Sequence, residues 1–587
     1  MLRERLLYVS LSAWCCGMLL FCGQVKADDM KEKIIIYQAL PRLFGNLNDT
    51  NRENGSLAEN GVGKMSAFSD KVLKSLHTMG FSHVWYTGII RHATQTDYSQ
   101  YGIPQSHPAV VKGKAGSPYS ISDYYDVNPD IADNIGQRMQ EFEDLVHRTH
   151  DAGMKVVIDF VPNHVARQYY SIAKPRDVED LGASDKTWKA FDPQNNFYYC
   201  PNDTFAPYID LKAGSEHAYM EMPAKATGND RFDAHPGKDD WYEAVKLNYG
   251  VDYCGGGAKC FYPMPDTWKK MTDILLFWAS KGVDAFRCDM AEMVPVDFWH
   301  YATDTLKKQY PDIRFIGEVY NPSLYRDYVG WGGFDYLYDK VGVYDTIRAA
   351  TTGTTRADAI TTAWQQTDDI KDHMLYFLEN HDEQRIASDF FAGDAMKALP
   401  GLVCSVLMGG NPFMMYMGQS LGEKGMGKEG FSGEDGRTTI FDYWCVKSLK
   451  RLLTNKLTPD EKALHRIYKT LLQFARKERT VAEGAFFDLM YVNPASNDFN
   501  PEKQYTFLRK HDNTLILVCV NFDDRDADVK VMIPEHAFDI LGMQECEAEG
   551  KELFSGARTF FNLQKDNSVS MKVGAHGAVV YKIKLKN

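Results

Sequence analysis

Apolar runs and helical patterns alternate along the chain from Lys33 to residue 480. The apolar runs at 34–40 and 81–89 predict two buried strands. Between them, residues 65–79 carry apolar side chains at helical spacing, and Gly80 follows directly, as glycine commonly does at the end of a helix. This is the order of a strand–helix–strand unit, and its repetition predicts a parallel sheet.

Eight strands are predicted in this part of the chain, with helical patterns between most of them. The alternation alone fits either an open, doubly wound sheet or a closed (β/α)8 TIM barrel. The number of strands and the polar residues at their ends favour the barrel. The predicted strands span residues 34–40, 81–89, 155–159, 282–289, 313–318, 334–338, 374–379 and 413–417.

Two stretches break this rhythm. The first, 164–265, is rich in Tyr, Phe, Trp, Asp and Gly without a helical period, and an insertion of that length after the third strand of a barrel is expected to form a small domain of its own. After a helical pattern at 459–479 the period changes to two, which predicts a C-terminal antiparallel β-sandwich. We therefore assign 28–163 and 266–480 to the barrel, 164–265 to the inserted domain and 481–587 to the β-sandwich.

The first 27 residues are predicted to be a signal peptide. Two arginines precede an apolar run at 6–23, and Val-Lys-Ala before Asp28 fits a cleavage site with small residues. The run is marginal for a transmembrane anchor and lacks a stop-transfer cluster after it. Lipid attachment at Cys22 is a further alternative, although the Phe directly before it fits a lipobox poorly. We expect simple export, to a periplasm, the cell surface or the medium.

The net charge and the cysteine content limit the kinds of molecule that the protein could bind. The chain has a formal net charge of −13 with both signs interspersed, which argues against nucleic acid and anionic membranes as partners. No other segment is apolar enough to span a membrane, and no Cys/His cluster indicates zinc. Cys254 and Cys260 flank a short Gly-rich loop, so we expect a disulfide between them in an oxidising compartment.

The chemistry-bearing residues lie where predicted strands end. Arg287 and Asp289 are two residues apart on one strand, so their side chains project side by side, and the guanidinium is expected to keep the carboxylate ionised. Three other strands end on polar groups, in the sequences VVIDFVPNH (156–164), FIGE (315–318) and YFLENHD (376–382). Active sites of parallel barrels are built at this carboxyl end of the strands.

These four motifs, in this order, resemble those of the α-amylase family of glycoside hydrolases, and the resemblance runs from Ile34 to the C-terminus. It implies a (β/α)8 barrel, an inserted domain B that walls one side of the substrate site, and a C-terminal β domain C. It also implies an α-glucan or oligosaccharide as substrate and no organic cofactor.

The resemblance assigns roles to three carboxyl groups. It implies that Asp289 is the nucleophile, that Glu318 is the general acid and base, and that Asp382 binds sugar hydroxyls and stabilises the oxocarbenium-like transition state. Hydrolysis with retention needs two such carboxyl groups, one to attack and one to protonate the leaving oxygen. The expected reaction is therefore double displacement.

Four further residues are implied to contact the substrate. Arg287 would orient the nucleophile, while His164 and His381 would bind sugar hydroxyls. Tyr119 precedes an Asp-x-Tyr pattern and would stack on a sugar ring, although packing is an equal alternative for it.

The chain departs from the family pattern just beyond the proposed nucleophile. Many members have Lys-His where this sequence has Ala291 and Glu292. Asn163 matches one calcium ligand of the family, so calcium is the one metal that the resemblance raises. Maltooligosaccharides, branched or cyclic dextrins and transglycosylation stay open, as does exo-acting α-glucosidase activity. A non-catalytic glucan-binding protein is disfavoured because all three carboxyl groups are present.

Overall fold

The structure is a computed structural model that describes residues 32–429 and 433–586. The predicted signal peptide, residues 1–27, lies outside these residues. Within them, no helix is both long and apolar enough to cross a membrane.

The centre of the fold is a closed barrel of eight parallel strands, which confirms the predicted TIM barrel. Every predicted strand overlaps an observed one. The barrel closes because β1 pairs on one side with β2 and on the other with β16. Around the barrel the order is β1 (Ile35–Ala39), β16 (Phe413–Tyr416), β15 (Met374–Phe377), β14 (Tyr336–Tyr338), β13 (Arg314–Gly317), β12 (Ala285–Cys288), β5 (Lys155–Phe160) and β2 (His83–Tyr86).

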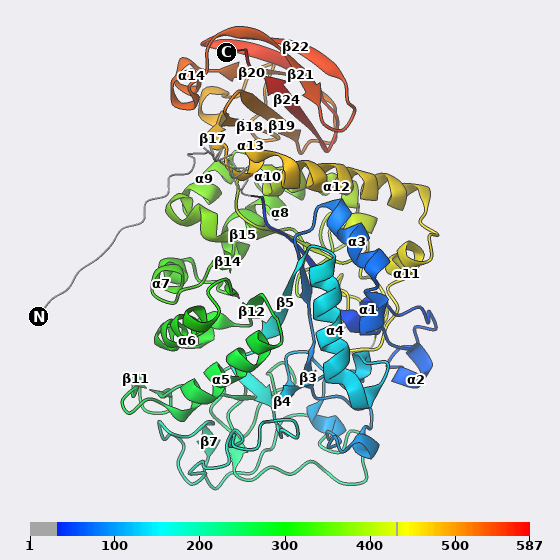
Figure 1. Ribbon diagram of the computed structural model, residues 1–587, viewed down its shortest axis with the longest axis vertical. Coiled ribbons are helices and arrows are strands. Elements are labelled where there is room, and N and C mark those ends of the chain that lie inside the picture. The colour runs from blue at the N-terminus through cyan, green and yellow to red at the C-terminus, as the bar shows by residue number, and fades with distance from the viewer. Residues whose placement is uncertain (1–31, 430–432, 587) are drawn as a thin grey trace, which may run out of the picture. The chain divides into compact units, whose positions relative to one another are not determined.

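Helices follow the strands and pack on the outside of the barrel (Figure 1). Helix α3 (Asp70–Met79) ends at Gly80 as predicted, in a left-handed conformation at φ 116°. A Cβ there would approach the carbonyl oxygen of Leu472 to 2.8 Å. Both the left-handed backbone and this close contact therefore require glycine at position 80. The other barrel helices include α4 (Arg138–Asp151), α5 (Asp266–Ser280), α6 (Val296–Gln309), α7 (Tyr325–Gly330), α8 (Asp345–Thr351), α9 (Ala359–Gln365), α10 (Leu399–Leu407) and α12 (Pro459–Lys477).

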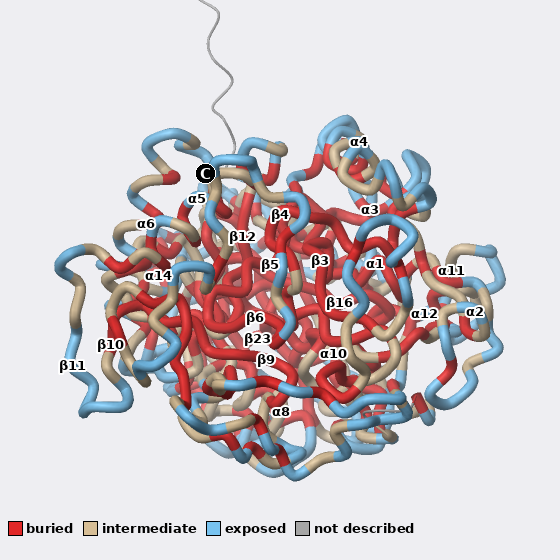
Figure 2. The backbone as a smooth tube through the Cα atoms, turned by 90° about the horizontal axis from the view of Figure 1, so that it is seen from below, coloured by how far each residue is buried: buried red, intermediate tan, exposed pale blue. Residues whose placement is uncertain are grey.

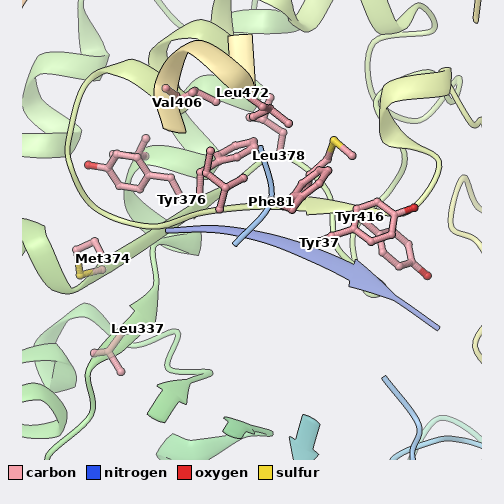
Figure 3. Packing of buried hydrophobic residues seen from close by; sticks show 14 of the residues in the cluster. Tyr37, Phe81, Leu337, Met374, Tyr376, Leu378, Val406, Tyr416 and Leu472 are labelled. Atoms are coloured by element: carbon pink, nitrogen blue, oxygen red, sulfur yellow. The ribbon is translucent and has the colours of Figure 1, made fainter. Parts of the chain in front are cut away.

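Alternate residues of each strand face two different layers of the core. Ile36 and Leu375 belong to the cluster inside the barrel, whereas their neighbours Tyr37 and Tyr376 pack between the strands and the helices. Figure 3 shows this outer layer, where Tyr37 and Tyr376 lie with Val406 of α10 and Leu472 of α12, among others. This alternation leaves the strand ends as the place where polar side chains gather.

The stretch predicted as the inserted domain, 164–265, lies between β5 and α5 and contains only short paired strands. Figure 2 shows β11 of this stretch exposed at the edge of the molecule, whereas its partner β10 is buried or intermediate. The paired strands are β6 (His164–Ala166) with β9 (Ala244–Lys246), β7 (Tyr199–Cys200) with β8 (Ala224–Lys225), and β10 (Val251–Asp252) with β11 (Ala258–Lys259).

The predicted disulfide between Cys254 and Cys260 is wrong for this structure, in which both are free thiols. Asp252 pairs with Ala258 across the hairpin, and the N–H of Cys260 donates to the carbonyl of Gly250. Cys260 therefore lies opposite Gly250, while Cys254 is in the turn beyond the strands. The register of the hairpin, rather than the short sequence separation, decides which residues meet.

Residues after α12 form an antiparallel β domain, which confirms the predicted C-terminal β-sandwich. Its larger sheet has six strands and its smaller sheet has two. The larger sheet runs β17 (Ala485–Asp488), β18 (Gln504–His511), β19 (Thr514–Asn521), β24 (Gly577–Lys584), β21 (Cys546–Glu552) and β22 (Arg558–Leu563), and the smaller pairs β20 (Ala527–Ile533) with β23 (Asn567–Val573).

Candidate active site

Strand register brings the two proposed catalytic carboxyl groups to neighbouring positions. In the pairing of β12 with β13, Cys288 lies opposite Gly317, so the next residues, Asp289 and Glu318, leave adjacent strands at the same level. The N–H of Glu318 donates to the carbonyl of Cys288 over 3.1 Å, which continues the ladder by one residue. Both side chains are more than nine-tenths buried.

Arg287 is the centre of the site. Its guanidinium is fully buried and contacts Asp289 Oδ1 at 2.8 Å through Nη1 and Glu318 Oε2 at 2.7 Å through Nη2. Nη1 also lies 3.3 Å from Asp159 Oδ1, because Arg287 and Asp159 are register partners on β12 and β5. Nε donates to the hydroxyl of Tyr338 over 3.3 Å. One rigid, planar cation thus fixes three carboxyl groups relative to one another.

Glu318 is also held by groups of the loops that follow β12 and β13. The N–H of Met290 donates to Oε2 over 2.8 Å, and the hydroxyl of Tyr320 donates to Oε1 over 2.6 Å. Glu292 in turn accepts the N–H groups of Tyr320 and Asn321 at 3.0 and 2.9 Å. The residue at which the sequence departs from the family pattern therefore anchors the segment that carries Tyr320.

Asp382 and His381 form the other side of the site, on the loop after β15. Asn380 Oδ1 accepts the N–H groups of Asp382 and Glu383, both at 2.8 Å, and this turn sets the direction of Asp382. His381 Nε2 lies 3.0 Å from Asp382 Oδ2, and its Nδ1 accepts from the amide of Gln38 over 2.8 Å. Nε2 therefore carries the ring proton.

Tyr119 links the two sides. Its hydroxyl contacts His381 Nε2 and donates to Asp159 Oδ1 over 3.3 Å, while its ring stacks on the His381 ring at a centroid distance of 5.1 Å. The Arg287 guanidinium lies 5.3 Å from the centre of the same ring. Only 8% of Tyr119 is exposed, so most of its ring packs against protein rather than facing outward.

His164 lies beside these residues. Within residues 32–429 and 433–586, its side chain has no hydrogen bond or ion pair to a proposed catalytic carboxyl group. It begins β6, its ring is 5.2 Å from that of Trp241, and its Nδ1 accepts from the Asn163 amide over 3.2 Å. The main chain of Tyr119 is close enough to influence the His164 ring. Burial lowers its pKa to about 3, so His164 is a neutral group next to Tyr119.

A sequence model described as the alpha amylase catalytic domain matches residues 38–483. The chain belongs to the α-amylase family of glycoside hydrolases. The match includes every proposed catalytic residue of the barrel rim, and the eight-stranded barrel is the fold that this resemblance implied.

Individual relatives of this α-amylase-family chain are distant. Maltase A1 of Drosophila melanogaster is 26% identical over 307 residues, which cover 52% of this chain and 42% of the relative. The cyclomaltodextrinase of Thermoanaerobacter pseudethanolicus is 21% identical over 442 residues, covering 74% of this chain and 63% of the relative. The chain therefore spans less than two thirds of either curated relative.

Solved structures share the fold over nearly the whole length. The crystal structure of a noncanonic maltogenic α-amylase, AmyB from Thermotoga neapolitana, has a TM-score of 0.60 with this chain at 20% identity. The superposition covers 94% of this chain and 99% of that one.

The carboxyl group of Asp289 binds its proton more tightly than an isolated one does. Burial raises the pKa of Asp289 well above its ordinary value, the negative charges of Glu318 and Asp382 raise it further, and Arg287 opposes both. Arg287 lowers the pKa of Asp289 as predicted, but the prediction that it keeps this carboxyl group ionised is wrong, because burial and the neighbouring carboxyl groups outweigh it. The guanidinium is a single positive charge, and it is shared among three carboxyl groups.

Two further acids of the site are shifted in the same direction. Burial raises the pKa of Asp159 to about 6, against the effect of Arg287. The pKa of Asp382 is raised to about 7, first by desolvation from the surrounding protein atoms and second by the charge of Glu318. Even so, 43% of the Asp382 side chain is exposed to water. Because these groups interact, the cluster retains protons near neutral pH as a unit.

The surroundings of Asn163 do not fit a calcium ion. The side-chain oxygen Oδ1 of Asn163 accepts a hydrogen bond from the Lys246 ammonium. The side-chain nitrogen Nδ2 donates to the main-chain carbonyl of Gly228 over 2.8 Å. Across the part of the chain that the structure describes, no group of three or more His, Cys, Asp or Glu side chains could hold a metal.

Sequence reasoning missed several residues of the site. Trp85 donates to Asp159 Oδ2 over 2.9 Å, and Gln38, Tyr320 and Tyr338 bond to His381, Glu318 and Arg287. Tyr320 could have been found, since it stands two residues after Glu318, where an extended chain returns to the same side. Gln38 and Trp85 are each the second-last residue of a strand, β1 and β2, and carry no local signal of their partners.

Proposed function

We propose that this protein hydrolyses α-glucosidic linkages in starch-derived glucans or maltooligosaccharides by double displacement. The observation that carries the proposal is the joint contact of one buried guanidinium, Arg287, with the carboxyl groups of Asp289 and Glu318. Two carboxyl groups held that closely fit a mechanism with a covalent intermediate, because an inverting enzyme needs room for a water between them.

In the first step Asp289 attacks the anomeric carbon. Its Oδ1 is bound by Arg287, and its Oδ2 has no hydrogen-bond partner among the described residues, so Oδ2 is the oxygen available to attack. Glu318 gives a proton to the leaving glycosidic oxygen as that bond breaks. The substrate must therefore reach Oε1 of Glu318, where the Tyr320 hydroxyl now lies.

In the second step a water molecule releases the sugar from Asp289. Glu318, now ionised, takes a proton from that water, and the oxygen of the water forms the new bond to the anomeric carbon. Asp382 stabilises the positive charge that develops on the sugar ring in both steps, and His381 keeps it in place through Nε2. Two inversions give a product with the α configuration.

The substrate is proposed to be short. The relatives include a maltase, a cyclomaltodextrinase and a maltogenic amylase, all named for small products or substrates. A transglycosylase or an exo-acting α-glucosidase would use the same residues. A product profile on maltoheptaose, cyclodextrin, pullulan and soluble starch separates these activities, and failure to cleave any of them, with purified folded protein, would favour the non-catalytic alternative.

Export is part of the same proposal and rests on the first 27 residues alone. Cleavage before Asp28 is expected. N-terminal sequencing of the protein from its native host tests this, and lipid found on Cys22 would replace secretion by membrane anchoring.

A further inference from the structure

A buried lysine lies where three segments of the chain meet. Lys246 is the last residue of β9, and its side chain is 2% exposed. Its ammonium contacts Asp230 Oδ1 at 2.6 Å, the carbonyl oxygen of Met293 at 3.3 Å, and Oδ1 of Asn163. Two of these oxygens come from outside the inserted segment, since Asn163 follows β5 of the barrel and Met293 belongs to the loop after β12.

The three oxygens surround the ammonium as they would surround a metal ion. A carboxylate, an amide carbonyl and a main-chain carbonyl are the oxygen types that calcium binds in proteins. A buried ammonium needs such partners, because an unpaired charge is costly to remove from water. A calcium ion could not share these ligands with Lys246, since it would place two further positive charges next to the ammonium.

We propose that the Lys246 ammonium replaces a structural metal ion at the junction between the barrel and the inserted segment. The cation is part of the chain, so this junction forms without calcium. Asn163, which the sequence suggested as a calcium ligand, instead accepts a hydrogen bond from lysine.

The position of this junction connects it to the proposed active site. Met293 ends the short turn Ala291–Met293, which begins directly after Met290, and the N–H of Met290 donates to Glu318. On the other side, Lys246 is the register partner of His164, which is adjacent to Asn163. Lys246 is thus a positioning residue, because it fixes loops on two sides of the site without facing the reacting atoms.

Thermal unfolding tests the proposal without any substrate, so its outcome does not depend on the proposed function. The melting temperature of the mature wild-type protein is measured after dialysis against EDTA and again with added calcium chloride. The variant Lys246→Met keeps most of the side-chain volume and removes the charge. Lys259→Met is the matched control, since Lys259 lies in the same inserted segment but its side chain is 60% exposed.

The proposal expects the wild-type melting temperature to be the same with EDTA and with calcium. Lys246→Met should melt lower than wild type by roughly 3 to 4 °C, because removing one partner of a buried ion pair is strongly destabilising. Lys259→Met should melt like wild type, since exposed ion pairs contribute little. If Lys246→Met does not fold, Asp230→Asn, which removes only the negative partner, should show a smaller decrease.

Two results would overturn the proposal. One is a fall in the wild-type melting temperature on EDTA treatment that the substitution Asn163→Ala abolishes, since this would place a metal on Asn163. The other is a Lys246→Met protein that melts together with Lys259→Met, since the buried ammonium would then hold nothing in place.

Discussion

The hydroxyl of Tyr320 donates a 2.6 Å hydrogen bond to Oε1 of Glu318, the oxygen that does not touch Arg287. Both oxygens of the proposed acid therefore have donors, and the glycosidic oxygen must take the place of Tyr320 during the reaction. Tyr320 is itself fixed through its main-chain N–H to Glu292. This chain of contacts gives Glu292, at the position of the family's Lys-His pair, a defined function.

Replacing Glu292 with Ala should lower kcat more than it raises KM. The substitution releases the N–H groups of Tyr320 and Asn321 and loosens the loop that orients Glu318, and small misplacements of a catalytic group cost on the order of 10- to 100-fold in rate. Glu292→Gln is the control, because its amide oxygen can still accept, and it should retain most of the activity. Both constants are measured on maltoheptaose.

A double-mutant cycle checks the proposed connection. If Glu292 acts through Tyr320, then Tyr320→Phe should add little further loss to Glu292→Ala. Fully multiplicative losses, or a Glu292→Ala enzyme with wild-type kcat, would show that this loop does not position the acid.

Azide distinguishes the proposed roles of Asp289 and Glu318. In Asp289→Gly, azide should enter in place of the missing nucleophile and give a β-glycosyl azide from an α-linked substrate with a good leaving group. In Glu318→Ala the covalent intermediate still forms, so azide should displace Asp289 and give the α-glycosyl azide. The configuration of each azide is read by NMR, and the opposite pattern would exchange the two roles.

The substitution Asp159→Asn should change the pH dependence of stability. Burial raises the pKa of Asp159 to about 6, so the folded protein holds this proton more tightly than the unfolded chain, whose Asp has a pKa of about 3.9. The protonated Asp159 side chain therefore stabilises the folded state most below pH 3.9. This contribution to the free energy of unfolding declines as the pH rises to about 6. The melting temperature of Asp159→Asn relative to wild type should increase between pH 4 and pH 7.

Asp159→Asn should also move the acidic limb of kcat/KM to lower pH. The charge of Asp159 is one of those that raise the pKa of Asp289, so its removal lets Asp289 ionise in more acidic solution. The limb is measured for both proteins on the same maltooligosaccharide. A limb that moves to higher pH would contradict this account of the carboxyl cluster.

The sequence predicts features that depend on local pattern. All eight barrel strands follow from their apolar runs, and Asp289 and Glu318 could be placed together because parallel strands end at one rim. Contacts between distant segments have no such signal. Gln38 bonds to His381 across 343 positions of sequence, and Lys246 reaches Asn163 from the end of the inserted segment.

The two wrong predictions share a cause. The disulfide was inferred from the sequence separation of Cys254 and Cys260, but hairpin register keeps them apart. The low pKa of Asp289 was inferred from Arg287 alone, but Glu318, Asp382 and Asp159 also act on this carboxyl group. In both cases one neighbour in sequence was weighed without the partners that only the fold brings near.

The most direct test of the proposed function is the configuration of the first product. Proton NMR follows the anomeric signals of the reducing sugar during the first minutes of hydrolysis, before mutarotation mixes them. Double displacement by Asp289 and Glu318 predicts that the α anomer appears first and the β anomer grows in only as mutarotation proceeds. A β anomer formed first would mean that water attacks directly, and it would contradict the covalent intermediate on Asp289.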